Sequence, residues 1–325
     1  MTVHRNDQRS GWTRRALAAG ALALAIGAVV PVAQAQELKT IKVVIIAGAQ
    51  FAPLYLGEEK GYFAKEGLKL DIVLGQDGAV YMPGVLSGDY HVAALNGINV
   101  FLAQEKGLPL QIFASGSSGG SNPDSHMSGF IVKGDSPYKT AKDLEGKTVA
   151  LAALKSLPEV IAKASLEKAG ADIKKVKFVE VPFPQMVAAV SQGRVDAAWA
   201  LEPFVTIGTN NGLRYIGGSY ASVVKDSPVA IWGGSATWLK ANKDTVAAFN
   251  RAIVASNEYA SANPQEARRI LGSWLKMPAA VAENMELPGW PSQISESGIM
   301  GLAELSRKYG VTDKPFDLKA AYFKP

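Results

Sequence analysis

The sequence predicts an α/β protein composed of two doubly wound units, each with a parallel sheet that helices cover on both faces. Three observations support this fold class. Short apolar strands alternate with helices of about ten or more residues, as in parallel sheets. This alternation occurs twice in the same order. The later part of each unit also contains a related phrase, "VLSGDYHVAALNG" and "VSQGRVDAAWALE", which indicates an internal repeat.

The first unit spans residues 41–97 and contains two glycines that are expected to end helical segments. Gly61 and Gly67 follow apolar residues at helical spacing. Glycine adopts the left-handed conformation that closes a helix, so Tyr62 and Phe63 should fold back onto the core. The expected elements are a strand at 41–46, a loop at 47–53, a helix at 54–65 and a strand at 70–74, followed by a short helix and a third strand.

The second unit, residues 147–202, repeats this order, and the region after it is mostly helical. Gly88 and Gly193 occupy the same place in the paired phrases; the alternative is a chance match between alanine-rich helices. In residues 237–325, Asn263-Pro264 should divide two helices, because a residue before proline disfavours the helical conformation. The second unit should contain a strand at 148–152, a helix at 158–168 and a strand at 176–181.

Residues 1–35 are predicted to be a secretory signal peptide that is removed from the mature chain. Arginines precede an apolar run at 16–32, and the small residues Ala33 and Ala35 suit the cleavage position. A membrane anchor needs roughly 20 apolar residues, whereas this run is shorter and contains Pro31. The general secretory and twin-arginine routes both stay open. We therefore expect an exported protein with no stable membrane anchor.

The composition argues against several classes of protein. Four arginines and one aspartate of the predicted leader account for more than half of the formal net charge of +5. The mature chain therefore lacks the basic footprint of a nucleic-acid-binding protein. The sequence contains no cysteine, which excludes a lipid-modified N-terminal cysteine, and a chain of this length buries enough surface without disulfides. These features predict a soluble protein in the periplasm.

The ligand site is expected at the carboxyl ends of the parallel strands, where open α/β sheets bind their ligands. The loops "GAQFAP" and "ALKSLP" lie at that edge in the two units. Gln50 and Phe51 should project from the first loop as a polar tip beside an aromatic face; the alternatives are a capping glutamine and a core phenylalanine. Tyr81 and Asn96 follow the second and third strands. Both also suit turns, since asparagine before glycine is typical of one.

A segment rich in glycine and serine is a further candidate. Ser115, Gly116 and Ser117 follow a strand expected at 110–114. Glycines there expose main-chain N–H groups that can hold an anion. The alternative is a flexible loop.

The start of the first helix in the second unit is another candidate. Lys155 and Ser156 come just before a helix expected to begin at Pro158. A serine and free amides at a helix N-terminus suit a sulfonate, nitrate or carboxylate. The alternative is a simple N-cap.

Six phrases occur in order along the mature chain: "PLYLGEEKGYFAKEGLKLDIV", "SGDYHVAALNG", "TAKDLEGKTVAL", "SLEKAGADIKKVKFVEVP", "SQGRVDAAWALEPF" and "NKDTVAAFNRAI". Together they resemble the ABC-transporter binding proteins for sulfonates, taurine and nitrate, a superfamily that also includes binders of thiamine pyrimidine precursors. The resemblance implies a type II periplasmic binding protein fold, in which two α/β lobes joined by two crossover segments close on a small molecule. It also implies a monomer whose partners are the transmembrane permease subunits of an ABC importer.

The resemblance assigns the lobes and their connections. Residues 36–130 and 230–325 should form the first lobe, and residues 131–229 the second. The crossovers are expected near 126–134 and 227–235, where glycines suit backbone segments that change conformation when lobes close.

Two further site candidates come from the same resemblance. Glu202, followed by Pro203 and Phe204, matches the acidic-Pro-aromatic phrase of the family at the far edge of the cleft. There it would bind N–H groups of the ligand or satisfy the main chain. Trp232, in the expected second crossover, would stack on a ligand.

The candidate residues leave the ligand class open. Sulfonates, taurine-like compounds and carboxylates rank first, because hydroxyl groups and helix N-termini hold anions without a cation. Lys155 is the only cation expected in these loops, and Phe51, Tyr81 and Trp232 suit a pyrimidine or another heteroaromatic compound almost as well. Nitrate or bicarbonate ranks third, since either would leave the aromatic residues unused.

An enzyme is the remaining interpretation, because residues 116–120 match G-x-S-x-G. That motif needs a following helix and a later histidine. Here Asn122-Pro123 follows, and the mature chain contains only His91 and His126. Metal and thiol chemistry have equally few candidate residues. We therefore expect a binding protein without a cofactor, a metal or a catalytic residue.

Overall fold

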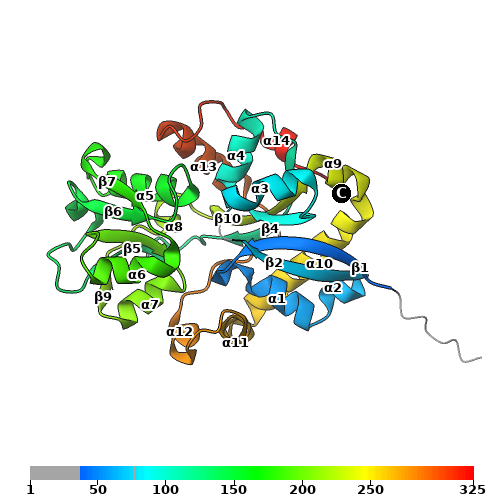
Figure 1. The fold of residues 1–325 in the computed structure, drawn as a ribbon, viewed down its shortest axis with the longest axis horizontal. Coiled ribbons are helices and arrows are strands. Elements are labelled where there is room, and N and C mark those ends of the chain that lie inside the picture. The colour runs from blue at the N-terminus through cyan, green and yellow to red at the C-terminus, as the bar shows by residue number, and fades with distance from the viewer. Residues whose placement is uncertain (1–36, 76–77) are drawn as a thin grey trace, which may run out of the picture. The chain divides into compact units, whose positions relative to one another are not determined.

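The computed structural model describes residues 37–75 and 78–325, which lie in one compact unit with two five-stranded sheets (Figure 1). The predicted signal peptide lies outside the described residues. In spatial order, the first sheet consists of β2 (Leu68–Gly75), β1 (Lys39–Ile46), β3 (Val92–Leu95), β10 (Pro228–Ser235) and β4 (Leu110–Ser118). The second consists of β7 (Lys177–Glu180), β6 (Thr148–Leu151), β8 (Ala197–Leu201), β5 (Ser128–Lys133) and β9 (Leu213–Tyr215).

The two sheets share one plan, which confirms the predicted repeat. β1 pairs in parallel with β2 and β3, and β6 pairs in parallel with β7 and β8. Gly88 and Gly193 have φ values of 88° and 70°, so the paired glycines make the same left-handed turn before β3 and β8. β10 and β5 are antiparallel to their neighbours. Both strands lie outside the two predicted units at 41–97 and 147–202, whose own strands are parallel as expected.

The connections between the sheets differ from the expected crossovers. The chain passes from β4 to β5 through residues 119–127 and from β9 to β10 through residues 216–227. These two connections run side by side, since the Gly119 N–H donates to the Ser227 carbonyl at 2.9 Å. The segments expected to cross, 126–134 and 227–235, are mostly strands instead. The assignment of the lobes by residue number stays a prediction.

Helices cover both faces of each sheet, as predicted. On the first sheet, α1 (Ala52–Glu59), α2 (Tyr62–Lys65) and α10 (Lys243–Ala262) contribute to the apolar cluster on one face, and α3 (Gly78–Ser87), α4 (Gly97–Glu105) and α13 (Glu296–Lys308) to the cluster on the other. On the second sheet, α5 (Leu157–Lys168) covers one face, and α6 (Phe183–Ser191) and α7 (Phe204–Asn210) cover the other. The remaining helical segments are η1 (Ala49–Phe51), η2 (Ala141–Leu144), η3 (Ile173–Lys175), α8 (Tyr220–Val223), α9 (Ala236–Ala241), α11 (Pro264–Trp274), α12 (Ala279–Asn284) and α14 (Leu318–Ala321).

The predicted helix boundaries are partly correct. The expected single helix at 54–65 is two helices, because Gly61 has a left-handed φ of 73° between α1 and α2. Phe63 is fully buried, as predicted, whereas Tyr62 is only partly covered. The break at Asn263-Pro264 is confirmed, since α10 ends at Ala262 and α11 begins at Pro264.

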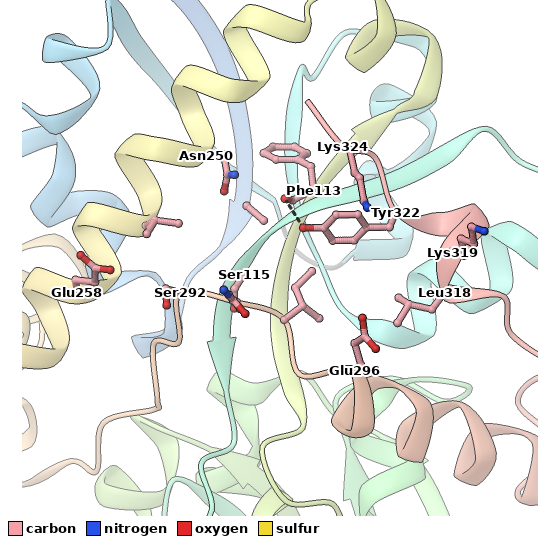
Figure 2. A pocket seen from close by; sticks show the side chains of 14 residues that line it. Phe113, Ser115, Asn250, Glu258, Ser292, Glu296, Leu318, Lys319, Tyr322 and Lys324 are labelled. Atoms are coloured by element: carbon pink, nitrogen blue, oxygen red, sulfur yellow. Dashed lines mark hydrogen bonds between the residues drawn. The ribbon is translucent and has the colours of Figure 1, made fainter.

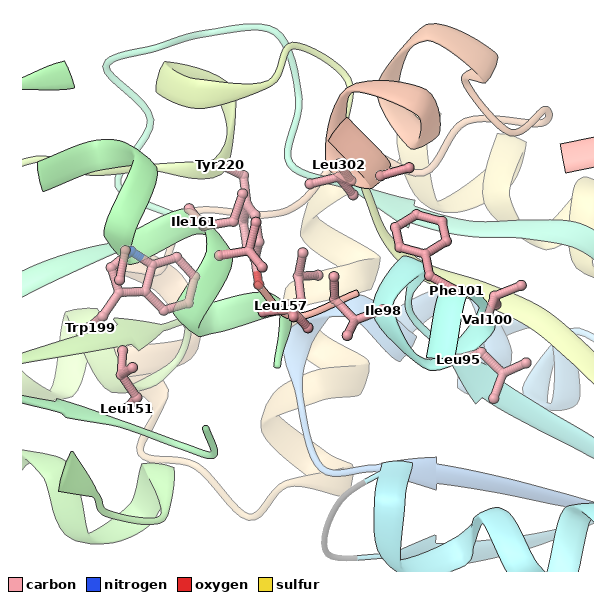
Figure 3. Packing of buried hydrophobic residues seen from close by; sticks show 14 of the residues in the cluster. Leu95, Ile98, Val100, Phe101, Leu151, Leu157, Ile161, Trp199, Tyr220 and Leu302 are labelled. Atoms are coloured by element: carbon pink, nitrogen blue, oxygen red, sulfur yellow. The ribbon is translucent and has the colours of Figure 1, made fainter. Parts of the chain in front are cut away.

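One apolar cluster extends across both sheets. In Figure 3, Ile98 and Phe101 of α4 lie near Leu302 of α13, and Leu157 and Ile161 of α5 lie near Tyr220 and Trp199. Ile98 and Leu157 stand in the first turns of their helices. The starts of α4 and α5 therefore share this cluster, and their apolar packing joins the two halves of the unit.

Within the described part of the chain, every helix is too short or too polar to cross a membrane.

Candidate functional site

A small cavity lies where the two sheets meet, at the carboxyl ends of β1 and β8. Ala49 and Gln50 reach it from the turn after β1, and Leu201 and Glu202 reach it from the end of β8. Its volume is about 10 Å³, which is space for one water molecule. The structure thus brings together Gln50 and Glu202, two of the predicted site residues. The lining residues are Ala49, Gln50, Met127, Leu201, Glu202, Tyr220, Val229 and Pro288.

Glu202 is the one residue with a carboxylate among the described residues that line this cavity. Its side chain is 2% exposed. One oxygen accepts the Thr206 N–H at 3.0 Å, and the other accepts the Thr206 hydroxyl at 2.7 Å and the Glu286 N–H at 3.1 Å. Burial raises the pKa of Glu202, and these hydrogen bonds act in the opposite direction. Since a carboxylate has about four acceptor positions, Glu202 can accept one more N–H group.

The cavity has no cationic side chain among its described lining residues. Lys155, the expected cation, is exposed and has a left-handed φ of 51°. Its main-chain N–H donates to the buried carboxylate of Glu159, which also pairs with Lys163. Glu159 in the first turn of α5 therefore satisfies the amide of Lys155, which precedes the helix, and Lys155 does not line the cavity.

Gln50 and Phe51 point to different places. Gln50 is buried in the cavity wall, and its main-chain carbonyl accepts the Trp290 indole N–H at 3.1 Å. Phe51 does not project from a loop, as expected, but lies in the core beside Trp232, with ring centroids 5.9 Å apart. Residues 49–51 form a turn of 3-10 helix, which directs the two side chains apart. The core alternative for Phe51 is the one that the structure shows.

Trp232 lies inside the first sheet and not in a connection. It stands in β10 opposite Ala94 of β3, is 2% exposed, and packs against Phe249 at 5.4 Å between ring centroids. Its indole nitrogen has no hydrogen-bond partner among the described residues. Trp232 is therefore a core residue here, outside the cavity lining.

Tyr81 and Asn96 both have structural contacts. Tyr81 belongs to α3, not to a turn, and its hydroxyl donates to the Ala94 carbonyl. Asn96 is the N-cap of α4: its side chain accepts the Asn99 N–H at 3.1 Å, and the Asn99 side chain accepts the Asn96 N–H at 3.1 Å. This reciprocal pair satisfies two free amides at the helix start.

Ser115, Gly116 and Ser117 belong to β4 and do not form a loop. β4 continues to Ser118, which pairs with Gly289, so the expected strand end at residue 114 is wrong. The motif G-x-S-x-G consequently lacks the strand–turn–helix geometry of a nucleophile elbow. A Cβ atom at Gly116 would come within 2.8 Å of the Ala230 carbonyl oxygen, so this glycine permits the close approach of β10.

Ser115 lines a different hollow. This pocket has a volume of about 1260 Å³ and lies beside β4, with Asn250 and Glu258 of α10 on one side and Lys319 and Tyr322 of the C-terminal segment on the other (Figure 2). None of its lining residues lines the small cavity. The predicted site residues mentioned so far therefore lie in the small cavity, in this larger pocket, in the core or in structural positions.

Ser156 stands at the N-cap position of α5, as the alternative interpretation expected, but its side chain accepts no helix amide. Its hydroxyl donates to the Ala153 carbonyl at 2.6 Å, and α5 begins at Leu157 rather than at Pro158. Ser156 does not line the cavity.

Several lining residues had no sequence signal that distinguished them. Met127, Tyr220 and Val229 come from the two connections and the start of β10, and Pro288 comes from the segment after α12. Apolar residues are common in connecting segments. These lining residues can therefore be recognised only in the structure, where segments far apart in the sequence come together. The described residues contain no group of side chains that could hold a metal ion.

The chain matches one family model and several known proteins. A family model described as NMT1/THI5 like matches residues 48–267. The formylaminopyrimidine-binding protein of Halalkalibacterium halodurans is 28% identical over 73% of this chain and 71% of its own length. The taurine-binding periplasmic protein of Escherichia coli is 22% identical over 82% of this chain and 78% of its own length.

A solved structure shows the same fold. The periplasmic aliphatic sulphonate binding protein of Escherichia coli superposes with a TM-score of 0.71 at 16% identity, covering 88% of this chain and 92% of that protein. The two sheets with their helices therefore form the two-lobed α/β fold of periplasmic binding proteins. These relatives are named as binding proteins and not as enzymes.

Proposed function

Because the chain belongs to the NMT1/THI5 like family, we propose that it is the solute-binding component of an ABC-type importer. In this role it captures a small molecule between its lobes in the periplasm and delivers it to the transmembrane permease subunits as a monomer. The observation that carries the proposal is the cavity at the carboxyl ends of β1 and β8, where both sheets contribute walls. The names of its relatives support the location and the role.

The cavity favours a heteroaromatic compound with N–H donors, the second of the two ligand classes that the sequence left open. Glu202 offers a carboxylate, and the described walls offer no cation. An anion about 4 Å from an ionised Glu202 would be repelled by about 4 kcal/mol at an effective dielectric constant of 20. Leu201, Tyr220 and Val229 provide apolar surface for a ring. The formylaminopyrimidine-binding relative supports the same class.

A ligand panel tests the proposal. Aminopyrimidines, taurine, alkanesulfonates and nitrate are compared by thermal shift and isothermal titration. A ligand at 100 times its dissociation constant should add about 2.7 kcal/mol of stability. Glu202→Gln should weaken an aminopyrimidine by about 1.5–3 kcal/mol, because a hydrogen bond to a charged group is lost. Glu258→Gln, at an exposed carboxyl, is the matched control.

The outcomes separate the ligand classes. Binding of a simple alkanesulfonate that Glu202→Gln strengthens would move the assignment to the organic anions that the sequence ranked first. Binding of taurine that Glu202→Gln weakens would indicate that the carboxylate meets an ammonium group. A shift with none of these compounds, but with a sugar, a peptide or a metal ion, would contradict the ligand class altogether.

A further inference from the structure

Residues 286–290, between α12 and α13, form a non-helical segment that we call the strap. Its Pro288 is buried and lines the cavity together with Gln50 and Glu202. Among the other lining residues, Leu201 and Val229 lie in β8 and β10, and Met127 and Tyr220 lie in the two connections. Ala49, Gln50 and Glu202 lie in the turns that follow β1 and β8. The strap is therefore the one described wall that lies neither in a strand, nor in a turn that follows one, nor in a connection between the sheets.

The strap is hydrogen-bonded to several parts of the site. Its Trp290 indole donates to the Gln50 carbonyl at 3.1 Å, 240 residues away in sequence. Its Glu286 N–H donates to the Glu202 carboxylate, and the Glu286 carboxylate accepts the main-chain N–H of His126. These bonds tie the strap to the turn after β1, to the acid after β8 and to the first connection.

The middle of the strap is fixed to the edge of the first sheet. The Ser118 N–H donates to the Gly289 carbonyl at 2.8 Å, and the Gly289 N–H donates to the Ser118 carbonyl at 3.1 Å. This pair extends the β4 edge by one residue of the strap. Pro288 thus lies between two hydrogen-bonded residues, Glu286 and Gly289, which hold its ring against the cavity.

The cavity must enlarge to take a ligand. Its volume of about 10 Å³ is far below the roughly 300–1,000 Å³ of ordinary ligand pockets. Gln50 and Glu202 are tied to strand ends inside the two sheets, whereas Pro288 stands on a five-residue segment. Substitution of the Pro288 side chain can therefore alter the space while the main-chain pair between Ser118 and Gly289 is kept.

The strap also lies beyond the segment that the family model matches. The family match ends at residue 267, and relatives that match the chain are named for ligands as different in size as taurine and formylaminopyrimidine. A wall outside the shared segment can differ between members while the two lobes stay the same. Such a wall suits the role of selecting among ligands.

We propose that the strap sets the size of the ligand that the cavity accepts, with Pro288 as the limiting wall and with Glu286 and Trp290 as the residues that position it. The proposal rests on the proposed function for the location of the ligand. Beyond that function, it assigns ligand selection to a segment that follows the residues matched by the family model.

The test compares a small and a large ligand of one class. Isothermal titration with 4-aminopyrimidine and its 5-benzyl derivative gives a ratio of affinities for each protein. Pro288→Ala should raise the relative affinity for the larger compound by about tenfold, the scale on which a hydrophobic pocket discriminates by size. Pro278→Ala, at an exposed proline before α12, is the matched control and should leave the ratio unchanged.

Positioning is tested in the same assay. Trp290→Phe removes the indole N–H that bonds to Gln50 while keeping an aromatic ring, and it should move the ratio in the same direction as Pro288→Ala. Trp274→Phe is the control, since Trp274 is half-exposed and stacks on Tyr55 outside the site. Unchanged ratios in folded Pro288→Ala and Trp290→Phe would overturn the proposal.

The strap stays testable if the ligand class is wrong. If the wild type binds neither pyrimidine, the comparison uses methanesulfonate and hexanesulfonate, and the same shift in ratio is expected. If it binds neither pair, hydrogen exchange decides: Glu286→Ala removes the carboxylate that accepts the His126 N–H and should speed exchange at that amide by about tenfold, which is about 1.4 kcal/mol of lost protection. Equal exchange in both proteins would overturn the strap's anchoring.

Discussion

Glu202 combines a structural and a proposed ligand-binding task in one side chain. It closes the start of α7 through Thr206 and holds the strap through Glu286. Three donors meet its two oxygens, yet burial outweighs them and the pKa is raised. A carboxyl in this position is costly to ionise and so must be compensated by donors. A ligand N–H group would supply a further donor.

The raised pKa of Glu202 predicts how stability depends on pH. A carboxyl whose pKa is higher in the folded state binds a proton more tightly there, so its contribution is present below the ordinary value of 4.5 and is lost as the pH rises through the folded value. As the pH rises from 4 to 7, the melting temperature of the wild type should therefore fall relative to that of Glu202→Gln. Differential scanning calorimetry at each pH measures this difference.

The control for this experiment is Glu258→Gln, at an exposed carboxyl in α10. Its melting temperature should follow that of the wild type at every pH. A constant difference between Glu202→Gln and the wild type would mean that Glu202 titrates as an ordinary carboxyl.

At the scale of elements, the helix starts show how local chemistry shapes the site. Asn96 and Asn99 close the start of α4 by a reciprocal pair of hydrogen bonds. At the start of α5, Glu159 accepts the Lys155 N–H and Ser156 bonds to the Ala153 carbonyl. The side chains of Asn96 and Ser156, two ligand-site candidates from the sequence, are thus already hydrogen-bonded beside their own helix starts.

The N-cap role of Asn96 predicts a loss of stability on substitution. Asn96→Ala should lower the free energy of unfolding by about 1 kcal/mol, the usual cost of removing an N-cap. Asn96→Asp should preserve stability, because aspartate accepts the same amide and favours the positive end of the helix dipole. Urea unfolding measures both. Asn284→Ala, at the exposed end of α12, is the control, and equal losses at both positions would contradict the capping role.

At the scale of the whole molecule, the two sheets are joined by paired connections, by the strap and by an apolar cluster. The Gly119–Ser227 bond keeps the connections together, and Ile98 and Leu157 pack in the same cluster from opposite sheets (Figure 3). A cavity of about 10 Å³ between such walls cannot take a ring-sized ligand. Binding therefore requires the walls to separate and to close again.

This requirement predicts a change in compactness on binding. Saturating ligand should lower the radius of gyration measured by solution X-ray scattering, because lobes that separate to admit the ligand close around it. A variant that binds but does not contract should fail in uptake by the transporter. An unchanged radius of gyration at confirmed saturation would contradict closure by hinge motion.

Export is a second prediction at this scale. Ala33 and Ala35 suit a signal-peptidase site, so mass spectrometry of a periplasmic extract should show a chain that begins near Gln36. The intact chain in the cytoplasm would contradict the predicted leader.

The sequence by itself determined the class of the fold, its repeat and its family. Strand and helix periodicities are local properties, and the left-handed conformations of Gly61 and Gly67 are local too, so these features could be predicted without the structure. The helix break at Asn263-Pro264 follows from the geometry of one residue pair in the same way. Of the predicted site, Gln50 from the strand-end rule and Glu202 from the family resemblance line the same cavity.

Only the tertiary structure decided which candidate side chains share the cavity. The pairing of β10 with β4 shifts register at several points, and each bulge changes the face to which later side chains point. Ser115 consequently lines a separate pocket, and Trp232 lies in the core. Pro288 entered the cavity because the strap bonds to Gln50, Ser118 and Glu202. Contacts between segments so far apart in the chain have no local pattern, because they depend on how whole elements pack.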